Sequence, residues 1–564
     1  MTNLKWWQSA VFYQIYPRSF ADGNGDGIGD LPGIISRLDY LQELGVDALW
    51  LSPHFPSPQA DCGYDISDYC SVAPEYGDMQ QFKLLLDETH RRGMRLILDL
   101  VLNHTSDQHA WFQESRSSLT NPKRDWYIWK PGNGSLPPNN WNSTFGGPAW
   151  QFDAHTGEYY YHFFFREQPD LNWRNPDVKA AMFAVVRFWL DMGVDGFRLD
   201  AIGTIFEDPG LPNHNAKFSQ VELYQMGDQA KTAEEKEHVK ALWEEMFCHQ
   251  HDRPEVHDLM RELRAVVDEY DDRVLVGETD DLAFYGNGKD ELHLVFNFPL
   301  MRTDRLTAAH VRANQATLNA GMPIGAWGCN VLGNHDCTRL ATQFADHGKN
   351  PDAMRAALVL LLTLPGSPFI YYGEEIGMTD MYLERPDQFR DPLGLVAYQL
   401  AVSLQGGNSP ATTRIAAEYS RDRCRTPMQW QNAPNAGFSP SGVTTWLPVN
   451  PNFTIGINVA DQDGDPKSLL NFYRRMLALR RQYPALISGE LTFLATDDPD
   501  LLVYERRTSD QTYLIIINFG KVPRRLDYPI PGASRLVLST HLSTLPASLD
   551  MPFVPQEARI YLIE

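Results

Sequence analysis

Eight short apolar segments, separated by helical segments, are the feature of this sequence that limits its possible folds most strongly. The helical segments include Leu31–Leu44 and Met79–Arg91. Strands that alternate with helices in this way predict an α/β fold built around a (β/α)₈ TIM barrel. The eight predicted strands are Val11–Tyr16, Ala48–Ser52, Arg95–Leu102, Gly196–Ala201, Arg273–Thr279, Leu292–Phe298, Asn330–Gly333 and Pro368–Tyr372.

Two regions depart from this alternation and predict further domains. Residues 105–170 follow the third strand and are rich in Trp, Asn, Gly and Pro, and a connection of this length is usually functional or a small domain of its own. Towards the C-terminus the pattern changes to short strands with turn residues between them, which predicts an antiparallel β-sandwich. We therefore expect the barrel in residues 1–104 and 171–484, an inserted domain B in 105–170, and the β-sandwich in 485–564.

The net charge and the cysteine pattern restrict the partners and the compartment. The formal net charge of −23 disfavours nucleic acid and anionic membranes as partners. The six cysteines are scattered without a Cys-x-x-Cys pair, which predicts neither a zinc site nor a disulfide framework and fits a reducing compartment. The N-terminus has no apolar signal core, and the longest apolar run, Ala356–Leu364, is too short to span a bilayer. We expect a cytoplasmic protein.

Titratable side chains stand where four of the predicted strands end, and this end of the strands is where a barrel places its chemistry. Arg198 lies two residues before Asp200, so both point to the same side of a strand. We expect Arg198 to lower the pKa of Asp200 and to keep it ionised, as a nucleophile requires. A purely structural ion pair has the same pattern. The residues at the four ends are His104, Asp200, Glu278 and the pair His335 and Asp336.

Three carboxylates at strand ends, Asp200, Glu278 and Asp336, predict glycoside chemistry, because retaining glycosidases use two carboxyl groups about 5 Å apart. We expect Glu278 to be a buried carboxyl with few hydrogen-bond donors, whose raised pKa suits a general acid. A metal-dependent barrel hydrolase is the alternative, with only His104 and His335 placed for it. The sequence has no Gly-x-Ser-x-Gly motif near these residues, which disfavours acyl transfer.

A loop near the N-terminus alternates oxygen-bearing residues with glycines, like the first half of an EF-hand. Its twelfth position is Gly33, where an EF-hand has a bidentate Glu. We expect one structural Ca²⁺ (or Mg²⁺) and no organic cofactor, and a turn without a metal is the alternative. The candidate ligands are Asp22, Asn24, Asp26, the carbonyl of Ile28, and Asp30.

Four segments in register resemble the signature regions of the α-amylase superfamily, glycoside hydrolase family 13. They are Asp99–His104, Gly196–Ala201, Val276–Glu278 and Asn334–Asp336. Two further segments are similar to the α-glucosidase and oligo-1,6-glucosidase branch of that family, namely Gln168–Trp173 and Arg421–Trp430. The resemblance covers nearly the whole chain.

The resemblance implies a role for each matching residue. Asp200 matches the nucleophile that forms a glucosyl ester, Glu278 the general acid/base, and Asp336 the third carboxylate, which binds substrate hydroxyls. It also implies a cation in the loop of Asp22–Asp30. The residues that match the surroundings of the terminal glucose are Asp61, Tyr64, His104, Phe145, Phe164, Arg198, Ala201, His335 and Arg421.

Smaller differences bear on the substrate. In this branch the residue after the nucleophile resembles a linkage selector, with Val associated with α-1,6 bonds and smaller or polar residues with α-1,4 bonds. Ala201 stands there, so we expect maltose-type α-1,4 bonds or sucrose, through a pocket-shape effect of about 1–3 kcal/mol. The segment Arg385–Gly394 is closer to bacterial α-glucosidases known for glucosyl transfer. The long segment Val396–Tyr419 can shape the acceptor side.

The combined prediction is a retaining, exo-acting α-glucosidase that hydrolyses short α-glucosides by double displacement, with transglucosylation. An oligo-1,6-glucosidase that acts on isomaltose-type bonds, and a sucrose-specific hydrolase or glucosyltransferase, are the alternatives. Non-catalytic transporter subunits of the superfamily have a transmembrane helix and have lost catalytic carboxylates, and this sequence shows neither feature. We expect a disaccharide or small oligosaccharide as the partner, and a monomer or homodimer.

Overall fold

The computed structural model describes residues 4–496, 498–527, 533–541 and 551–563, and eight parallel strands at its centre close into a barrel. The order around the barrel is β1-β11-β10-β9-β8-β7-β3-β2, which confirms the predicted (β/α)₈ fold. The strands are β1 (Phe12–Ile15), β2 (Ala48–Leu51), β3 (Arg95–Val101), β7 (Gly196–Asp200), β8 (Val274–Gly277), β9 (Leu294–Asn297), β10 (Cys329–Val331) and β11 (Ser367–Tyr371).

The barrel strands are apolar on both faces because side chains fill the barrel on one side and helices cover the other. Every residue of β1, β2, β7, β8, β9, β10 and β11 is buried. Inside the barrel, Phe12 of β1 stacks on Phe369 of β11 with ring centroids 4.3 Å apart. This packing makes the strand ends a rigid platform for the side chains that follow them.

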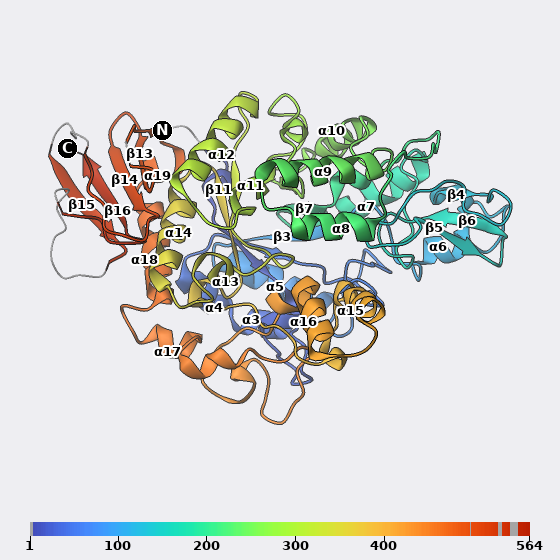
Figure 1. The fold of residues 1–564 in the computed structure, drawn as a ribbon, viewed down its shortest axis with the longest axis horizontal. Helices are drawn as coiled ribbons and strands as arrows, with labels where there is room; N and C mark the ends of the chain where they lie inside the picture. Colours follow the sequence, from blue (N-terminus) through green and yellow to red (C-terminus); the bar gives the residue numbers. More distant parts are fainter. Residues whose placement is uncertain (1–3, 497, 528–532, 542–550, 564) are drawn as a thin grey trace.

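Helices surround the barrel (Figure 1). The predicted helix over residues 31–44 is two helices, because Arg37 leaves helical geometry between them, with φ −111° and ψ 6°. The helices of more than one turn on the barrel are α3 (Leu31–Ser36), α4 (Leu38–Leu44), α5 (Met79–Arg91), α7 (Pro176–Met192), α10 (Glu255–Val267), α12 (Ala308–Gly321), α13 (Leu340–Phe344), α14 (Pro351–Thr363) and α18 (Leu469–Gln482).

Helix ends follow the capping rules. The Asp78 side chain accepts from the amides of Gln80 and Gln81 at the start of α5, and α7 ends at Gly193 with φ 108°, a left-handed conformation that favours glycine. The remaining helices are α1 (Trp6–Ser9), α2 (Pro17–Phe20), α6 (Ala110–Ser115), α8 (Gln220–Gln229), α9 (Ala233–Phe247), α11 (Phe298–Met301), α15 (Pro392–Gln405), α16 (Pro410–Tyr419), α17 (Val459–Asp463) and α19 (Ala485–Ser488).

The inserted segment after β3 carries a small sheet of its own, with strand order β4-β6-β5. Its strands are β4 (Trp129–Lys130), β5 (Trp150–Asp153) and β6 (Glu158–Tyr161). A separate apolar cluster there includes Trp141 and Phe163, and Leu223 of α8 and Phe247 of α9 belong to the same cluster. The region between β7 and β8 therefore packs on the inserted segment at one end of the molecule (Figure 1).

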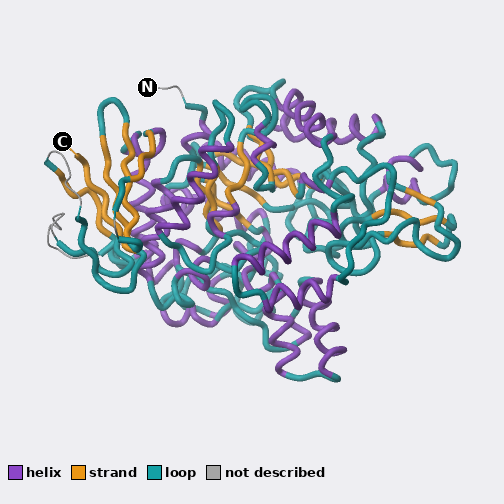
Figure 2. Tube along the Cα trace, turned by 45° about the horizontal axis from the view of Figure 1, so that its top comes forward, coloured by secondary structure: helices purple, strands orange, loops and turns teal. Residues whose placement is uncertain are grey.

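The C-terminal region is antiparallel, as predicted, and lies at the opposite end of the molecule from the inserted sheet (Figures 1 and 2). Its described residues form one five-stranded sheet, in which Leu502 and Tyr504 join the main core while Leu501 and Val503 join a cluster on the other face. A second sheet of the predicted sandwich is not among those residues. The strands in sheet order are β12 (Glu490–Phe493), β13 (Leu501–Arg507), β14 (Thr512–Asn518), β16 (Ala558–Ile563) and β15 (Ser534–Ser539).

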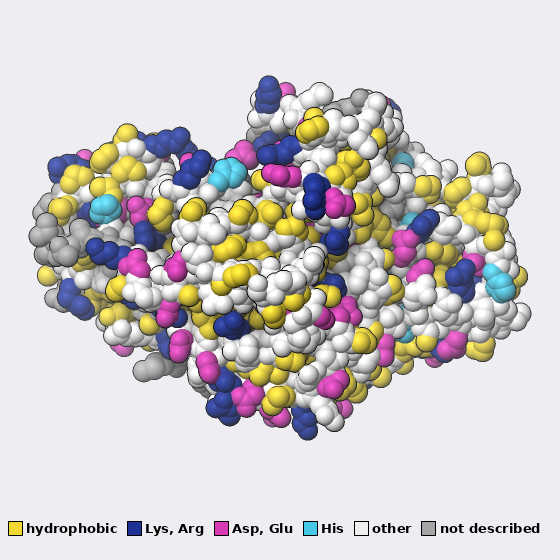
Figure 3. Space-filling model, turned by 90° about the horizontal axis from the view of Figure 1, so that it is seen from below, with side chains coloured by type: hydrophobic (Ala, Val, Ile, Leu, Met, Phe, Trp, Pro, Cys, Tyr) yellow, Lys and Arg dark blue, Asp and Glu magenta, His cyan; other side chains and the backbone are white. Residues whose placement is uncertain are grey.

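Three observations concern surface and compartment. Within the described ranges, no helix is long and apolar enough to cross a membrane. All six cysteines lie in those ranges and are free, as expected from their spacing. The face shown in Figure 3 carries acidic and basic side chains interspersed with one another.

Candidate active site

Arg198 of β7 is the centre of a charged cluster at the strand ends. Its Nη1 donates to Oδ1 of Asp99 and to Oδ1 of Asp200, both at 2.7 Å, and its Nη2 lies 2.9 Å from Oε1 of Glu278. The register of the barrel explains this, because Asp99 of β3 pairs with Arg198 across the sheet. The prediction that Arg198 and Asp200 share one side of the strand is confirmed.

The environment of Asp200 differs from the prediction. Burial raises the pKa of Asp200 well above its ordinary value, and although Arg198 lowers it, the charges of Glu278 and Asp99 raise it again. The expectation that Arg198 gives Asp200 a lowered pKa is therefore wrong, because one guanidinium is shared among three carboxylates in a buried site. Ionised Asp200 nevertheless depends on Arg198, which is the nearest positive charge.

Glu278 follows β8 and has two donors, which corrects the expectation of a buried carboxyl with few of them. Its Oε2 accepts from the backbone amide of Ala201 at 2.8 Å, and its Oε1 faces Arg198. The Glu278 side chain is 25% exposed, so it borders open space rather than the apolar core.

Ala201 directs its amide to Glu278 because the chain turns sharply there. Its φ of 42° and ψ of 43° are left-handed, a conformation that is uncommon for residues other than glycine and often marks functional positions. The hydroxyl of Thr204 donates to the Ala201 carbonyl at 2.7 Å and lies 3.1 Å from Oδ1 of Asn103. These bonds hold the turn that places Ala201 beside both carboxyls.

Asp336 lies among positive groups after β10. Arg425 donates to its Oδ1 at 2.5 Å, Arg421 lies 3.5 Å away and His335 3.2 Å away. Burial raises the pKa of Asp336, but three groups outweigh burial and hold that pKa well below its usual range. They are His335, which is protonated only at the low pH where Asp336 itself titrates, and the guanidinium groups of Arg425 and Arg421. Asp336 is therefore a permanently charged acceptor for hydroxyl groups.

Tyr64 links His335 to the carboxylate cluster. The Tyr64 hydroxyl donates to Oδ2 of Asp99 at 3.1 Å and lies 2.5 Å from Nε2 of His335, on which its ring stacks. Burial lowers the pKa of His335 to about 3, so the ring is neutral near pH 7. With the Gln14 amide nitrogen assigned to Nδ1 of His335, at 2.7 Å, Nε2 carries the proton and can donate.

A second network closes the site on its other side. Arg421 donates to Oδ1 of Asp61 and to Oδ1 of Asp391, each at 2.7 Å. The amide nitrogen of Gln168 donates to Asp61 at 3.1 Å and lies 2.9 Å from Nε2 of His104. Burial lowers the pKa of His104 to about 4, so His104 is a neutral hydrogen-bonding group rather than a charge.

Two aromatic side chains of the inserted segment reach this network. Phe164 packs edge-on against His104, with centroids 5.1 Å apart, and lies 5.5 Å from Phe145. The guanidinium of Arg421 lies 6.0 Å from the centroid of Phe145. The structure thus brings the predicted catalytic and glucose-surrounding residues together into one connected cluster.

Some members of the site were not assigned by the sequence analysis. Asp99, Gln168, Asp391 and Arg425 each bond directly to a predicted site residue. All four lie in segments that resemble the family, so the sequence could have marked them as candidates. It could not show which residues they contact, because those contacts depend on the relative placement of distant loops.

The candidate metal loop is closed by its own hydrogen bonds. Asp30 accepts from the amides of Gly23, Asn24 and Gly33, and Asp22 from those of Gly25 and Gly27. Oδ1 of Asp30 accepts two of these amides, while Oδ2 of Asp30 and both oxygens of Asp22 accept one each and keep a second lone pair. With Asn24, Asp26 and the Ile28 carbonyl, the remaining donor set suits one hard cation. Among the described residues, no three His, Cys, Asp or Glu side chains are grouped to hold a metal, so amide and carbonyl oxygens are required.

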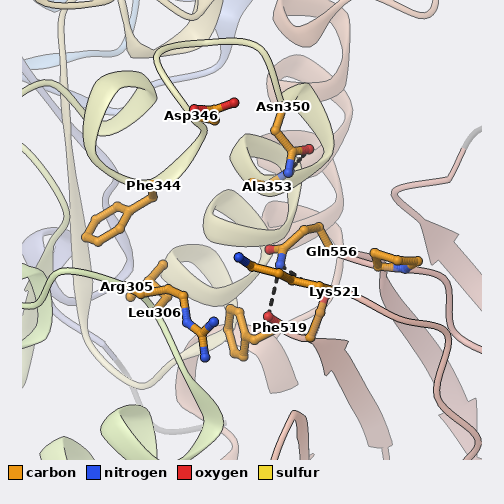
Figure 4. Close-up of a pocket in the computed structure, with 11 residues that line it drawn as sticks. Arg305, Leu306, Phe344, Asp346, Asn350, Ala353, Phe519, Lys521 and Gln556 are labelled. Carbon is orange, nitrogen blue, oxygen red and sulfur yellow. Dashed lines mark hydrogen bonds between the residues drawn. The ribbon is translucent and has the colours of Figure 1, made fainter.

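A large cavity lies elsewhere and contains none of the predicted site residues. It has a volume of 570 Å³ and lies between the barrel and the C-terminal sheet, where Arg305, Phe344, Lys521 and Gln556 line it (Figure 4). Among the described residues that line it, Asp346 is the one carboxylate, so the cavity has no carboxylate cluster like that around Arg198.

Comparison with known proteins identifies the family. The family model of the α-amylase catalytic domain matches residues 14–489. The chain belongs to glycoside hydrolase family 13, the α-amylase family. An oligo-1,6-glucosidase of Parageobacillus thermoglucosidasius is 38% identical over 99% of both chains, and an α-glucosidase of Pediococcus pentosaceus is 41% identical over 88% of both.

Solved structures of the family have the same fold. The trehalulose synthase of Pseudomonas mesoacidophila superposes with a TM-score of 0.87 at 37% identity and covers 100% of both chains. A mutant isomaltulose synthase of Erwinia rhapontici, in complex with sucrose, superposes with a TM-score of 0.86 at 36% identity and the same coverage. As a member of this family, the protein is a glycoside hydrolase.

Proposed function

We propose that this family 13 enzyme is a retaining, exo-acting α-glucosidase that cleaves short α-glucosides with maltose-type α-1,4 bonds, or sucrose. The observation that carries this proposal is that Asp200 and Glu278 share the guanidinium of Arg198, at 2.7 and 2.9 Å. Two carboxyl groups that both contact Arg198 are close enough to act on the same glycosidic bond, as a retaining glycosidase requires. The names of the relatives, among them α-glucosidase and oligo-1,6-glucosidase, support the substrate class.

The reaction proceeds by two displacements. In the first, Glu278 gives its proton to the glycosidic oxygen while a carboxylate oxygen of Asp200 attacks the anomeric carbon, so the aglycone leaves and a glucosyl ester forms. In the second, Glu278 takes a proton from an incoming water or alcohol, whose oxygen attacks the same carbon as the ester bond to Asp200 breaks. Two inversions give net retention of configuration.

Exo action is supported by the network that closes one side of the site. Asp61, Gln168 and Asp391 are buried, and Arg421 ties Asp61 to Asp391. We infer that the terminal glucose ends at this network, with the carboxyl groups of Asp61 and Asp336 as hydroxyl acceptors. A polymer chain therefore enters only by its non-reducing end.

Ala201 supports the α-1,4 or sucrose preference, because its backbone amide bonds to Glu278 and its small side chain takes little space near the bond to be cleaved. Oligo-1,6-glucosidase activity is the competing candidate, favoured by the names of several relatives. Sucrose is the ligand of solved neighbours, which favours sucrose as a further substrate here.

A product time course tests the proposal. Purified enzyme receives maltose, isomaltose, sucrose or trehalose separately, and NMR follows the anomer of the first glucose released. We expect α-glucose from maltose or sucrose, faster than from isomaltose, with trisaccharides as transfer products. Release of β-glucose would contradict the retaining mechanism, and faster cleavage of isomaltose would establish the oligo-1,6-glucosidase instead.

The same proposal includes the setting of the enzyme. It works in the cytoplasm as a monomer or homodimer, on a sugar and not on nucleic acid or membranes, supported by six free cysteines and a net charge of −23. The Asp22–Asp30 loop holds one structural divalent cation, supported by its set of oxygen donors. That cation would stiffen the loop, whose Asp30 caps α3, and takes no part in the reaction.

A further inference from the structure

An apolar groove lies between α8 on one side and α15 and α16 on the other. Its volume is 310 Å³, within the size range of small-molecule sites. Figure 1 shows α8 across from α15 and α16 on the same side of the barrel. The groove is lined by Phe145, Val221, Tyr224, Gln225, Asp228, Leu393, Val396, Ala397, Leu400, Ala401, Leu404, Ile415 and Tyr419.

The α15 wall is one continuous helix face. Its lining residues recur at the spacing of an amphipathic helix, from Leu393 to Leu404. Such a stripe normally packs into a core, but here Val396 is 43% exposed, Leu400 37% and Leu404 61%. A contiguous exposed apolar face on a soluble enzyme marks a binding site more often than chance.

The opposite wall is built in the same way and is joined to the first at one end. Val221, Tyr224 and Asp228 lie three and four residues apart on one face of α8. The Tyr419 hydroxyl of α16 donates to Oδ2 of Asp228 at 3.0 Å, and the rings of Tyr224 and Tyr419 meet edge to face. The groove is therefore held between two fixed walls.

The groove borders the predicted glucose site through Phe145. Phe145 lines the groove, and the guanidinium of Arg421, which bonds to Asp61, lies 6.0 Å from the centroid of the Phe145 ring. Leu393 of the groove follows Asp391, the second partner of Arg421, by two residues. Phe145 and the segment from Asp391 to Leu393 therefore border both the predicted sugar site and the groove.

We propose that this groove binds the apolar part of the group attached to, or accepting, glucose: the alkyl or aryl portion of an acceptor alcohol or of a leaving aglycone. The proposal rests on the proposed α-glucosidase function. The acceptor hydroxyl attacks the anomeric carbon of the glucosyl ester, Glu278 takes the hydroxyl proton, and the bond to Asp200 breaks, so an alkyl or aryl α-glucoside forms. A second copy of the chain is the competing occupant, but the small volume of the groove, and its Phe145 wall that also faces Arg421 of the sugar site, favour a small molecule.

The first test is a series of straight-chain alcohols from methanol to hexanol, offered at equal low concentration with maltose as donor. The measured quantity is the ratio of alkyl glucoside formed to glucose lost to hydrolysis. Because each buried methylene contributes about 0.8 kcal/mol, the ratio should rise about threefold to fourfold per carbon. If the enzyme hydrolyses maltose but the ratio does not rise with chain length, the proposed role of the groove is wrong, while the proposed α-glucosidase function stands.

The second test uses Leu400→Asp and Leu404→Asp, with Leu400→Met as a conservative variant. Leu84→Asp on α5, where Leu84 is 48% exposed, is the matched control outside the groove. We expect the two groove aspartates to flatten the chain-length dependence and to leave maltose hydrolysis unchanged, while Leu400→Met and Leu84→Asp keep the wild-type slope. If the groove variants keep the wild-type dependence on chain length, the proposal is refuted. It is also refuted if these variants convert a dimer into monomers without changing that dependence. If the wild-type enzyme does not cleave maltose, the proposed function fails first.

Discussion

The backbone amide of Ala201 donates to Oε2 of Glu278 at 2.8 Å, so the residue that follows the proposed nucleophile is bonded to the proposed acid/base. Ala201 makes this bond from a left-handed conformation, with φ 42°. A side chain at position 201 therefore acts in two ways, through its size beside the cleaved bond and through the turn that orients Glu278.

Ala201→Val tests this coupling. A β-branched residue is unfavourable at positive φ, so the substitution should strain the turn by about 1–3 kcal/mol and lower kcat/KM for maltose about 10–100-fold. If Ala201 selects the linkage, isomaltose should lose less activity than maltose. Ala201→Gly relieves the strain and keeps the amide, so its kcat/KM should stay near wild type. Equal losses on both substrates would mean that position 201 does not select.

Asp200→Asn removes the proposed nucleophile without changing its shape. Because no ester can form, kcat on maltose should fall at least about 10⁴-fold, with an unchanged circular dichroism spectrum and melting curve. Asp304→Asn, at a side chain that is 97% exposed, is the control. An Asp200→Asn enzyme with near-normal turnover would remove Asp200 from the nucleophile role.

Arg198→Lys tests the shared cation. Burial raises the pKa of Asp200 and Arg198 opposes that rise, and a lysine cannot bond three carboxylates in the same geometry. The pKa of Asp200 should rise further, and since ionised Asp200 is required, the acidic limb of the kcat/KM–pH profile should move to higher pH. Profiles on maltose for wild type and variant measure this. An acidic limb that stays in place would show that Arg198 does not control the ionisation of Asp200.

The burial of His54 should make the free energy of unfolding depend on pH, independently of the candidate active site. It is fully buried against Phe82, neither ring nitrogen has a partner among the described residues, and burial lowers its pKa from 6.5 to about 3. The unfolded chain therefore binds the extra proton below pH 6.5, and stability falls as pH drops from 6.5 toward 3, by about 2 kcal/mol at pH 5. His54→Phe should lose less stability than wild type between pH 7.5 and pH 5.

Urea unfolding at the two pH values measures the His54 effect. His541→Gln, at an exposed position, should behave like wild type. If His54→Phe and wild type lose the same stability on acidification, the buried His54 ring does not contribute.

Cation removal tests the Asp22–Asp30 loop. If a divalent ion binds there, a chelator should lower Tm and added Ca²⁺ should restore it, because a ligand at one hundred times its Kd stabilises by about 2.7 kcal/mol. Asp26→Ala should abolish the response to Ca²⁺, while Asp39→Ala, outside the loop and 76% exposed, should retain it. A Tm that responds to neither chelator nor Ca²⁺ would mean that the loop is held by its own hydrogen bonds.

Most of the barrel could be predicted because its signal is local. Buried parallel strands are continuous apolar runs, and the predicted strand Arg95–Leu102 differs from β3 by one residue. The helix over residues 31–44 was mispredicted as one element, because its apolar spacing continues across Arg37, where the backbone leaves helical geometry. Periodicity reports which face is buried and not whether each residue keeps helical dihedrals.

The residue types at the strand ends were determined by the sequence itself, since chain order and strand length place Asp200, Glu278 and Asp336 at one rim of any such barrel. Only the tertiary structure decided how they are charged. Arg425 reaches Asp336 from 89 residues away, and Arg198 is divided among three carboxylates. A pKa depends on burial and on every nearby charge, and both are set by how distant segments pack together.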